Sequence, residues 1–169
     1  MPKEIKLVIL DVDGVMTDGK IYYGVSGELI KRFSAKDGFF IKHVAPSVGI
    51  NFAIITGGFG DIVRKRATVL GIDHVYAEHV DKEASYFELK DRLHLEDEEI
   101  AYIGDDWFDW SAMKHAGFKG APLDADEEIK KRVDVVTKAK GGNGVVREFL
   151  YYIMERDNKL EEAKSKYFD

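Results

Sequence analysis

Cysteine is absent from the sequence, and so is any long apolar run. Without cysteine the chain has no disulfide framework, no thiolate nucleophile and no thiolate metal ligand. The longest apolar run near the N-terminus, residues 7–10, is too short for a signal peptide or a membrane span. We therefore expect a cytoplasmic protein without a membrane partner.

Positive charge is also scarce, with 25 lysine and arginine residues against 31 aspartate and glutamate residues, which gives a net charge of −6. No basic field would collect the phosphates of a nucleic acid, so no nucleic-acid partner is expected. A small anionic substrate is still compatible with this charge, because a few local cations or a metal can outweigh it. The length of 169 residues predicts one domain over residues 1–169.

Apolar, β-prone runs alternate with segments of helical periodicity. The expected strands cover residues 5–10, 50–56, 74–77, 100–104 and 133–137, and the expected helices cover residues 61–71, 81–93, 107–117 and 144–156. The strand runs are continuously apolar, which is typical of strands that are covered on both faces. The pattern predicts an α/β fold: a Rossmann-like parallel sheet with helices on both faces.

Three segments depart from this alternation. Residues 20–33 contain two β-prone runs around "GVSGE", which predicts a β-hairpin inserted after the first strand, as a flap or an oligomer contact. Its Tyr22 and Tyr23 are expected to pack rather than to take part in chemistry. Pro46 should end or kink a helix early. The polar tail at residues 157–169 should project from the core or be helical only in part.

Polar residues follow the expected strands where each one ends. They are Asp11 and Asp13, then Thr56, Gly57 and Gly58, then Lys82, and finally Asp105, Asp106 and Asp109. Ligands of a parallel α/β sheet bind beyond the carboxyl ends of its strands, so these residues should converge. Each group alone could be a turn or a solvated surface, and only the combination indicates a site.

The combined residue types favour phosphoryl transfer. Several carboxylates around one point need a hard cation, and oxygen ligands without histidine or cysteine favour Mg²⁺. A threonine hydroxyl and glycine amides can hold phosphoryl oxygens, and a lysine can neutralise an anionic nucleophile. Together these residue types are suited to transfer of a phosphoryl group to a carboxylate.

The motifs "DVDGVMTDG", "IITGG", the lysine in "VDKEAS" and "IGDDWFDW" resemble, in order and spacing, the four motifs of the haloacid dehalogenase-like phosphatases. The runs "SAKDG", "GGNGVVRE" and "KLEEAKS" are similar to a capless subclass that acts on sugar-acid phosphates. The resemblance implies a short hairpin in place of a second domain. It also implies a homotetramer in which a neighbouring subunit helps to close the site.

By this resemblance Asp11 attacks phosphorus and forms an aspartyl-phosphate. Asp13 protonates the leaving sugar oxygen and then deprotonates the hydrolytic water. Magnesium would be held by Asp11, the main-chain carbonyl of Asp13 and Asp105, with Asp109 orienting these ligands. Asp106 receives no role.

The resemblance also implies binding residues. Thr56, Gly57 and Lys82 would hold the transferring phosphoryl group. The substrate-binding positions would be Asp13, Ser34, Ala35, Lys36, Asp37, Gly38, Lys42, Arg66 and Lys82.

The activity implied is a magnesium-dependent phosphatase for a keto sugar acid, with 3-deoxy-D-manno-octulosonate 8-phosphate as the leading substrate. Such phosphatases often carry arginine at the position of Gly58, so a nine-carbon keto acid 9-phosphate is an alternative substrate. A non-catalytic tetramerisation module of the same fold is a third interpretation. A phosphomutase is disfavoured, because it would need a cap to exclude water.

Overall fold

The computed structural model describes residues 3–79 and 81–169 and contains a central six-stranded sheet in the order β5-β4-β1-β6-β7-β8. Every neighbouring pair in this sheet is parallel. The strands are β1 (Leu7–Leu10), β4 (Asn51–Ile55), β5 (His74–Tyr76), β6 (Ile100–Ile103), β7 (Phe118–Ala121) and β8 (Val135–Val136).

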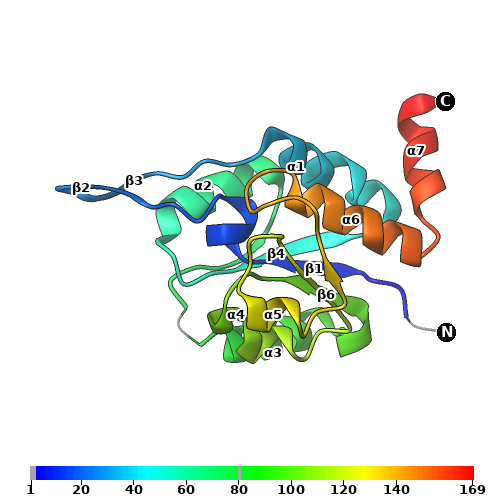
Figure 1. The fold of residues 1–169 in the computed structure, drawn as a ribbon. Helices are drawn as coiled ribbons and strands as arrows, with labels where there is room; N and C mark the ends of the chain where they lie inside the picture. The colour runs from blue at the N-terminus through cyan, green and yellow to red at the C-terminus, as the bar shows by residue number, and fades with distance from the viewer. Residues whose placement is uncertain (1–2, 80) are drawn as a thin grey trace.

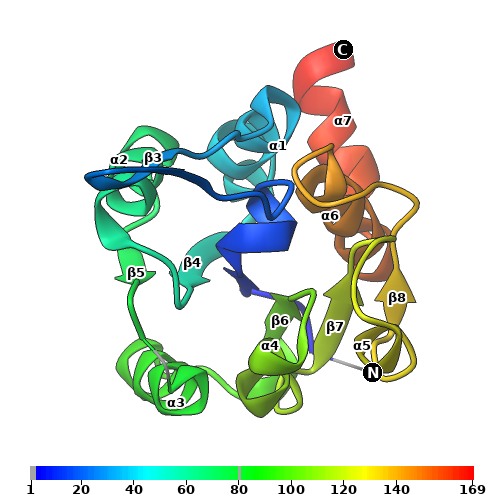
Figure 2. The same cartoon turned by 60° about the vertical axis from the view of Figure 1, so that its left-hand side comes forward.

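Helices cover both faces of the sheet (Figures 1 and 2). One face carries α1 (Ala35–Phe39), α2 (Gly60–Leu70), α6 (Val145–Arg156) and α7 (Leu160–Phe168), and the other carries α3 (Lys82–Leu93), α4 (Trp107–Met113) and α5 (Glu127–Lys130). The predicted α/β architecture is confirmed. Among the described residues, no helix combines the length and apolar character that crossing a membrane requires.

Strand β1 lies in the middle of the sheet and contributes side chains to the hydrophobic core on each face of it. Leu7 and Ile9 pack toward α3 and α4, whereas Val8 and Leu10 pack toward α2 and α6. In the sheet register, Leu10 is paired with Ile54, one residue before the end of β4, and with Ile103, the last residue of β6. The residues that follow these three strands therefore meet at one edge.

All five expected strands are present with shorter bounds, and one further strand, β7, was not predicted. Its sequence "FKGA" is short and contains a lysine and a glycine, so it lacks the apolar run that marks the other strands. Gly120 is required there by packing, because a Cβ atom would lie 2.4 Å from the ring of Phe149 in α6. The formation of β7 therefore depends on packing against α6 rather than on a local sequence pattern.

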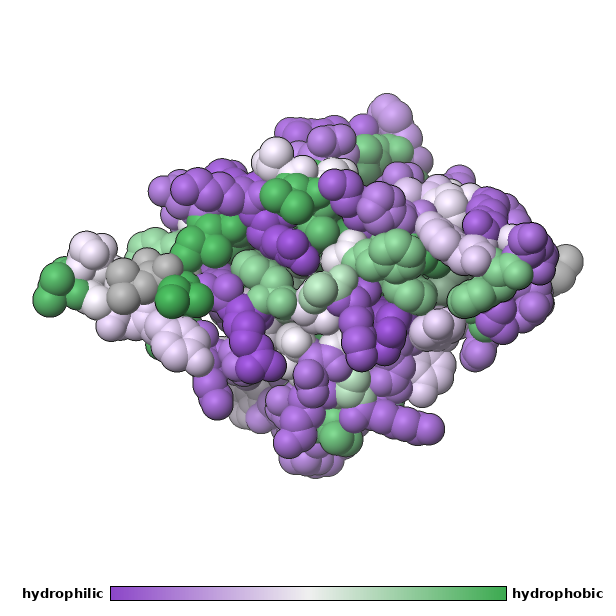
Figure 3. Space-filling model, turned by 90° about the horizontal axis from the view of Figure 1, so that it is seen from above, coloured by the Kyte–Doolittle hydropathy of each residue, from purple (hydrophilic) through white to green (hydrophobic). Residues whose placement is uncertain are grey.

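The predicted hairpin is formed by β2 (Tyr22–Gly24) and β3 (Gly27–Ile30), which make a separate antiparallel pair. It projects from the domain (Figure 1), and the space-filling view shows hydrophobic residues along it among pale and grey ones (Figure 3). Tyr22, Tyr23 and Val25 are exposed. The tyrosines therefore do not pack into the core of their own chain.

The predictions for Pro46 and for the tail are confirmed in outline. Helix α1 continues into a π-helical turn at Phe40–Val44, and Pro46 then begins a short 3-10 helix, where its missing N–H leaves no hydrogen bond unmade. The tail is helical over α7, and Ala163 is its buried contact with the domain.

Candidate active site

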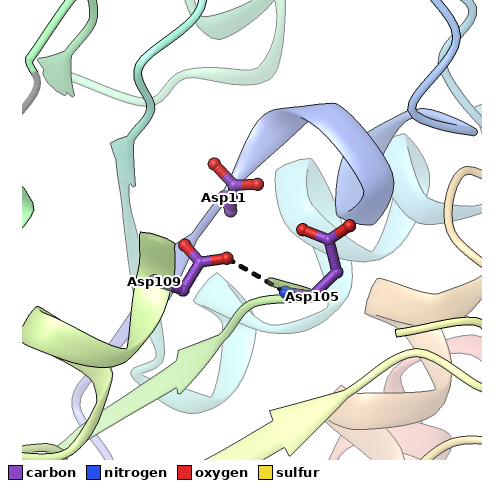
Figure 4. Close-up of side chains that lie close together, drawn as sticks. All are labelled: Asp11, Asp105 and Asp109. Carbon is purple, nitrogen blue, oxygen red and sulfur yellow. Dashed lines mark hydrogen bonds between the residues drawn. The ribbon is translucent and has the colours of Figure 1, made fainter. Parts of the chain in front are cut away.

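Three aspartates gather at the carboxyl edge of the sheet. Asp11 directly follows β1, Asp105 follows β6 by two residues, and Asp109 lies in the first turn of α4. Oxygen atoms of the three carboxylates lie within 4.8 Å of one another. Figure 4 shows the three side chains around a common space. The sheet thus brings together residues that are nearly 100 positions apart in the sequence.

Lys82 joins two of these carboxylates. It is the first residue of α3, and its side chain is only 1% exposed. Its Nζ donates to Asp11 Oδ1 and to Asp109 Oδ1, both at 2.7 Å. Although burial alone would lower the pKa of Lys82, the two carboxylates raise it above its ordinary value. Lys82 is therefore a permanent cation in the cluster.

Both carboxylate oxygens of Asp109 accept hydrogen bonds. Its Oδ1 accepts from Lys82 and from the Tyr102 hydroxyl at 3.1 Å, and its Oδ2 accepts from the amides of Asp105 and Asp106 at 3.0 and 3.3 Å. Because both oxygens are already occupied by donors, Asp109 is suited to orienting the cluster. Tyr102 was missed in the sequence because it lies within the apolar run of β6. Asp106 caps α4 through the amide of Trp107.

The electrostatics of the cluster favour a cation. Burial, together with the Asp109 carboxylate, raises the pKa of Asp11 to about 7, although Lys82 opposes this shift. Burial, together with Asp11 and Asp109, raises the pKa of Asp105 to about 8. Carboxylates that repel one another and offer only oxygen atoms fit a hard divalent ion such as Mg²⁺. Asp11, Asp105 and the neighbouring main chain would hold it.

The turn that carries "DVDG" needs glycine for two reasons. Gly14 has a φ of +92°, and a Cβ atom there would lie 2.0 Å from Asp105 Oδ2. The glycine run near residue 141 packs on the same turn: a Cβ atom on Gly141 would lie 2.0 Å from the carbonyl oxygen of Gly14. The Gly142 amide donates to the carbonyl of Val15 at 2.8 Å. The two distant glycine motifs therefore form one packed unit.

An open pocket of about 460 Å³ lies beside the cluster. It is lined by Asp11, Asp13, Gly19, Ile21, Thr56, Gly57, Gly58, Lys82, Asp105, Asp106, Phe108 and Asp109. The predicted catalytic, phosphoryl-binding and metal-binding residues are all in this list. Ile21 and Phe108, which the sequence did not single out, are the larger apolar side chains in it.

Thr56 and Phe108 shape the phosphoryl side of this pocket. The buried Thr56 hydroxyl accepts from the Gly58 amide at 3.2 Å. The Phe108 ring lies over Gly57, where a Cβ atom would approach it to 2.9 Å, and 4.8 Å from Lys82 Nζ. Phe108 therefore forms a wall beside the groups that would hold a phosphoryl group.

Asp13 lies in the pocket and forms an ion pair with the hairpin. Lys31, which directly follows β3, donates from its Nζ to Asp13 Oδ1 at 2.6 Å. Sequence reasoning missed Lys31. The only sign of it was a lysine at the end of a β-prone run.

Four of the predicted substrate-binding residues hold α1, α2 and α6 together. The Ser34 hydroxyl caps α1 by accepting from the Asp37 amide at 3.2 Å, and Arg66 donates to the Ser34 carbonyl at 3.4 Å. Asp37 is buried and accepts from the Arg147 amide, at the beginning of α6, at 2.8 Å. Gly38 lies under Arg66, where a Cβ atom would come within 2.5 Å of Nη2.

Of the other members of that set, Asp13 and Lys82 line the pocket, whereas Ala35, Lys36 and Lys42 are exposed. Neither these three residues nor the four that join the helices are among the described residues that line the pocket. A role in substrate binding stays a prediction for all of them.

Comparison with known proteins agrees with this geometry. The model of the haloacid dehalogenase-like hydrolase family matches residues 48–149. A 3-deoxy-D-manno-octulosonate 8-phosphate phosphatase from Yersinia pestis is 43% identical over 159 residues, which are 94% of this chain and 84% of that protein. The corresponding phosphatase from Escherichia coli K12 is 40% identical over 164 residues, which are 97% of this chain and 87% of that protein.

Solved structures of such phosphatases have the same fold. One from Moraxella catarrhalis, in complex with magnesium, phosphate and KDO, has a TM-score of 0.90 at 36% identity and covers 96% of this chain and 93% of its own. A cobalt-bound form from Haemophilus influenzae has a TM-score of 0.88 at 38% identity and covers 92% of this chain and 91% of its own. The chain belongs to the haloacid dehalogenase-like hydrolase family.

Proposed function

We propose that the protein is a magnesium-dependent phosphatase that hydrolyses 3-deoxy-D-manno-octulosonate 8-phosphate through an aspartyl-phosphate on Asp11. The observation that carries the proposal is the cluster of Asp11, Asp105 and Asp109, bridged by Lys82, at the edge of an open pocket. The named relatives supply the substrate.

The reaction proceeds in two steps. An Asp11 oxygen forms a bond to phosphorus while the bond from phosphorus to the sugar oxygen breaks, and the Asp13 carboxyl donates its proton to that oxygen. Asp13 then accepts a proton from water, whose oxygen bonds to phosphorus as the Asp11–phosphorus bond breaks and phosphate leaves. Lys82, the Thr56 hydroxyl and the Gly57 amide would hold the phosphoryl oxygens.

Magnesium, held by Asp11, the Asp13 carbonyl and Asp105, would supply positive charge that reduces repulsion between the nucleophile and the phosphate. An all-oxygen donor set and the raised pKa values of Asp11 and Asp105 support this assignment. The cobalt-bound relative shows that one such phosphatase also accepts another divalent ion.

The substrate assignment is tested by phosphate release from eight-carbon and nine-carbon keto acid phosphates, with magnesium and with EDTA. We expect the highest kcat/KM for 3-deoxy-D-manno-octulosonate 8-phosphate and no turnover in EDTA. Gly58 is the feature that favours the alternative, and faster turnover of a nine-carbon 9-phosphate would establish it. Hydrolysis that is independent of metal would contradict the role of Asp105.

We also propose that the protein is a cytoplasmic homotetramer assembled through the hairpin. Exposed apolar side chains on the hairpin support an interface there: Ile21, Tyr22, Tyr23, Val25 and Ile30. Val25→Ser is expected to lower the mass measured by light scattering. Val69→Ser, which changes an equally apolar exposed residue on α2, is the matched control and should leave the mass unchanged.

A further inference from the structure

Asp13 is held by a contact that no motif predicts. Lys31 Nζ lies 2.6 Å from Asp13 Oδ1, and the lysine side chain is 1% exposed against 24% for the aspartate. Solvated surface ion pairs hold their partners weakly, because water competes for both charges. Here the ammonium is shielded from water, so the contact restricts where the carboxylate can point.

Gly58 makes room for the second oxygen of the same carboxylate. A Cβ atom built on Gly58 would lie 2.6 Å from Asp13 Oδ2 and 3.7 Å from Lys31 Nζ. In the arrangement that this chain adopts, a side chain at position 58 would therefore require the Asp13 carboxylate to turn or to move. Lys31 thus holds one oxygen of the Asp13 carboxylate, and the absence of a side chain at Gly58 leaves room for the other.

We propose that Lys31 is a positioning residue for Asp13. By holding Oδ1, it directs Oδ2 over Gly58 into the pocket, where this oxygen exchanges the proton with the leaving sugar oxygen. The proposal rests on the proposed phosphatase function and adds to it a role for the hairpin. Lys31 is not among the described residues that line the pocket, and its contact with Asp13 is the one through which we propose that it acts.

The test compares two leaving groups. A sugar oxygen needs a proton as it departs, whereas 4-nitrophenolate leaves as a stable anion and gains little from an acid. The rate of phosphoryl transfer to Asp11 is measured in single turnovers, with magnesium, for a sugar phosphate and for 4-nitrophenyl phosphate. The ratio of the rate with the sugar phosphate to the rate with 4-nitrophenyl phosphate separates the effect on proton transfer from the effect on binding of the phosphoryl group.

Lys31→Met should slow transfer from the sugar phosphate about 10- to 100-fold and transfer from the aryl phosphate less than about 3-fold. Lys31→Arg should restore most of the loss. Lys20→Met, which removes an exposed lysine two residues before β2, is the matched control and should change neither rate.

Equal losses on both esters, or no loss on either, would overturn the proposal. Gly58→Ala tests it independently if Lys31→Met fails to fold, because its Cβ displaces Asp13 from the opposite side and should lower the same ratio. Wild-type enzyme that accepts other sugar phosphates, but not 3-deoxy-D-manno-octulosonate 8-phosphate, would overturn the proposed substrate only. The comparison with 4-nitrophenyl phosphate would then be made with the sugar phosphate that the enzyme accepts.

Discussion

Asp11 and Asp37 are both aspartates that the sequence assigns to the active site, and they are 5% and 3% exposed. Asp11 shares an ammonium with a second carboxylate and opens on a pocket. Asp37 accepts instead from main-chain amides at the beginning of α6, and these oppose the rise in its pKa that burial causes. The two aspartates are alike in residue type and in burial, and their partners are what distinguish the carboxylate that we propose as the nucleophile.

Asp11→Asn should give the largest functional effect. The amide is a poor nucleophile, so phosphate release should fall by at least about 10³-fold. Removing one of several mutually repelling carboxylates should leave the thermal midpoint within a few degrees of wild type. Phosphate-release assays and thermal unfolding in parallel check both parts, and substantial remaining turnover would rule out the covalent mechanism.

Lys82→Met should impair both activity and stability. The apolar side chain has a similar length but leaves Asp11 and Asp109 buried without their counter-charge, which costs about 3–5 kcal/mol of unfolding free energy in EDTA. Turnover should fall about 10²- to 10³-fold. Urea unfolding with and without magnesium measures the stability part. An unchanged free energy in EDTA would show that Lys82 serves only the substrate.

Asp37→Ala should have the opposite profile to Asp11→Asn. Loss of the contact with the Arg147 amide should cost about 1–3 kcal/mol of unfolding free energy, because the buried amide is left without an acceptor. At a temperature where the variant is folded, kcat and KM should match wild type. A KM that rises while the unfolding midpoint stays constant would instead support the substrate-binding role that the resemblance implies.

The pH dependence of stability should give the smallest effect. Because burial raises the pKa of Asp11 and of Asp105, the folded metal-free protein keeps protons that the unfolded chain has already released above about pH 4. Stability from these groups is therefore lost as the pH rises through about 7 to 8. In EDTA the thermal midpoint should fall by a few degrees from about pH 5.5 to about pH 8.5, and magnesium should reduce the fall. A thermal midpoint that rises over this pH interval would contradict the raised pKa values of Asp11 and Asp105.

The architecture and the centre of the site could be predicted because their signals are local. An apolar run followed by aspartates marks the end of a strand, and parallel topology brings such ends together without further information. Asp11, Thr56, Lys82 and Asp105 were accessible in this way. Their exact contacts, such as the bridge from Lys82 to two carboxylates, depend on the register of β1 between β4 and β6.

The remaining features depend on contacts between distant segments. Lys31 reaches Asp13 only because the hairpin returns to the sheet edge, and no periodicity in the hairpin records that return. Tyr102 resembles any other core residue of β6 until Asp109 is placed beside its hydroxyl. Asp37 illustrates the reverse case: the resemblance names it as a substrate-binding residue, but the sequence did not reveal its contact with the Arg147 amide.

The interlocked glycines at 14 and 141 bear on when the enzyme becomes competent during its synthesis. The first motif is synthesised before residues 141 and 142, yet the turn that carries it is packed and hydrogen-bonded by those later residues. Contacts of such long sequence separation form late. A nascent chain therefore contains Asp11 long before the contacts that fix the turn beside it can form, and we expect activity to begin only after residue 142 has left the ribosome.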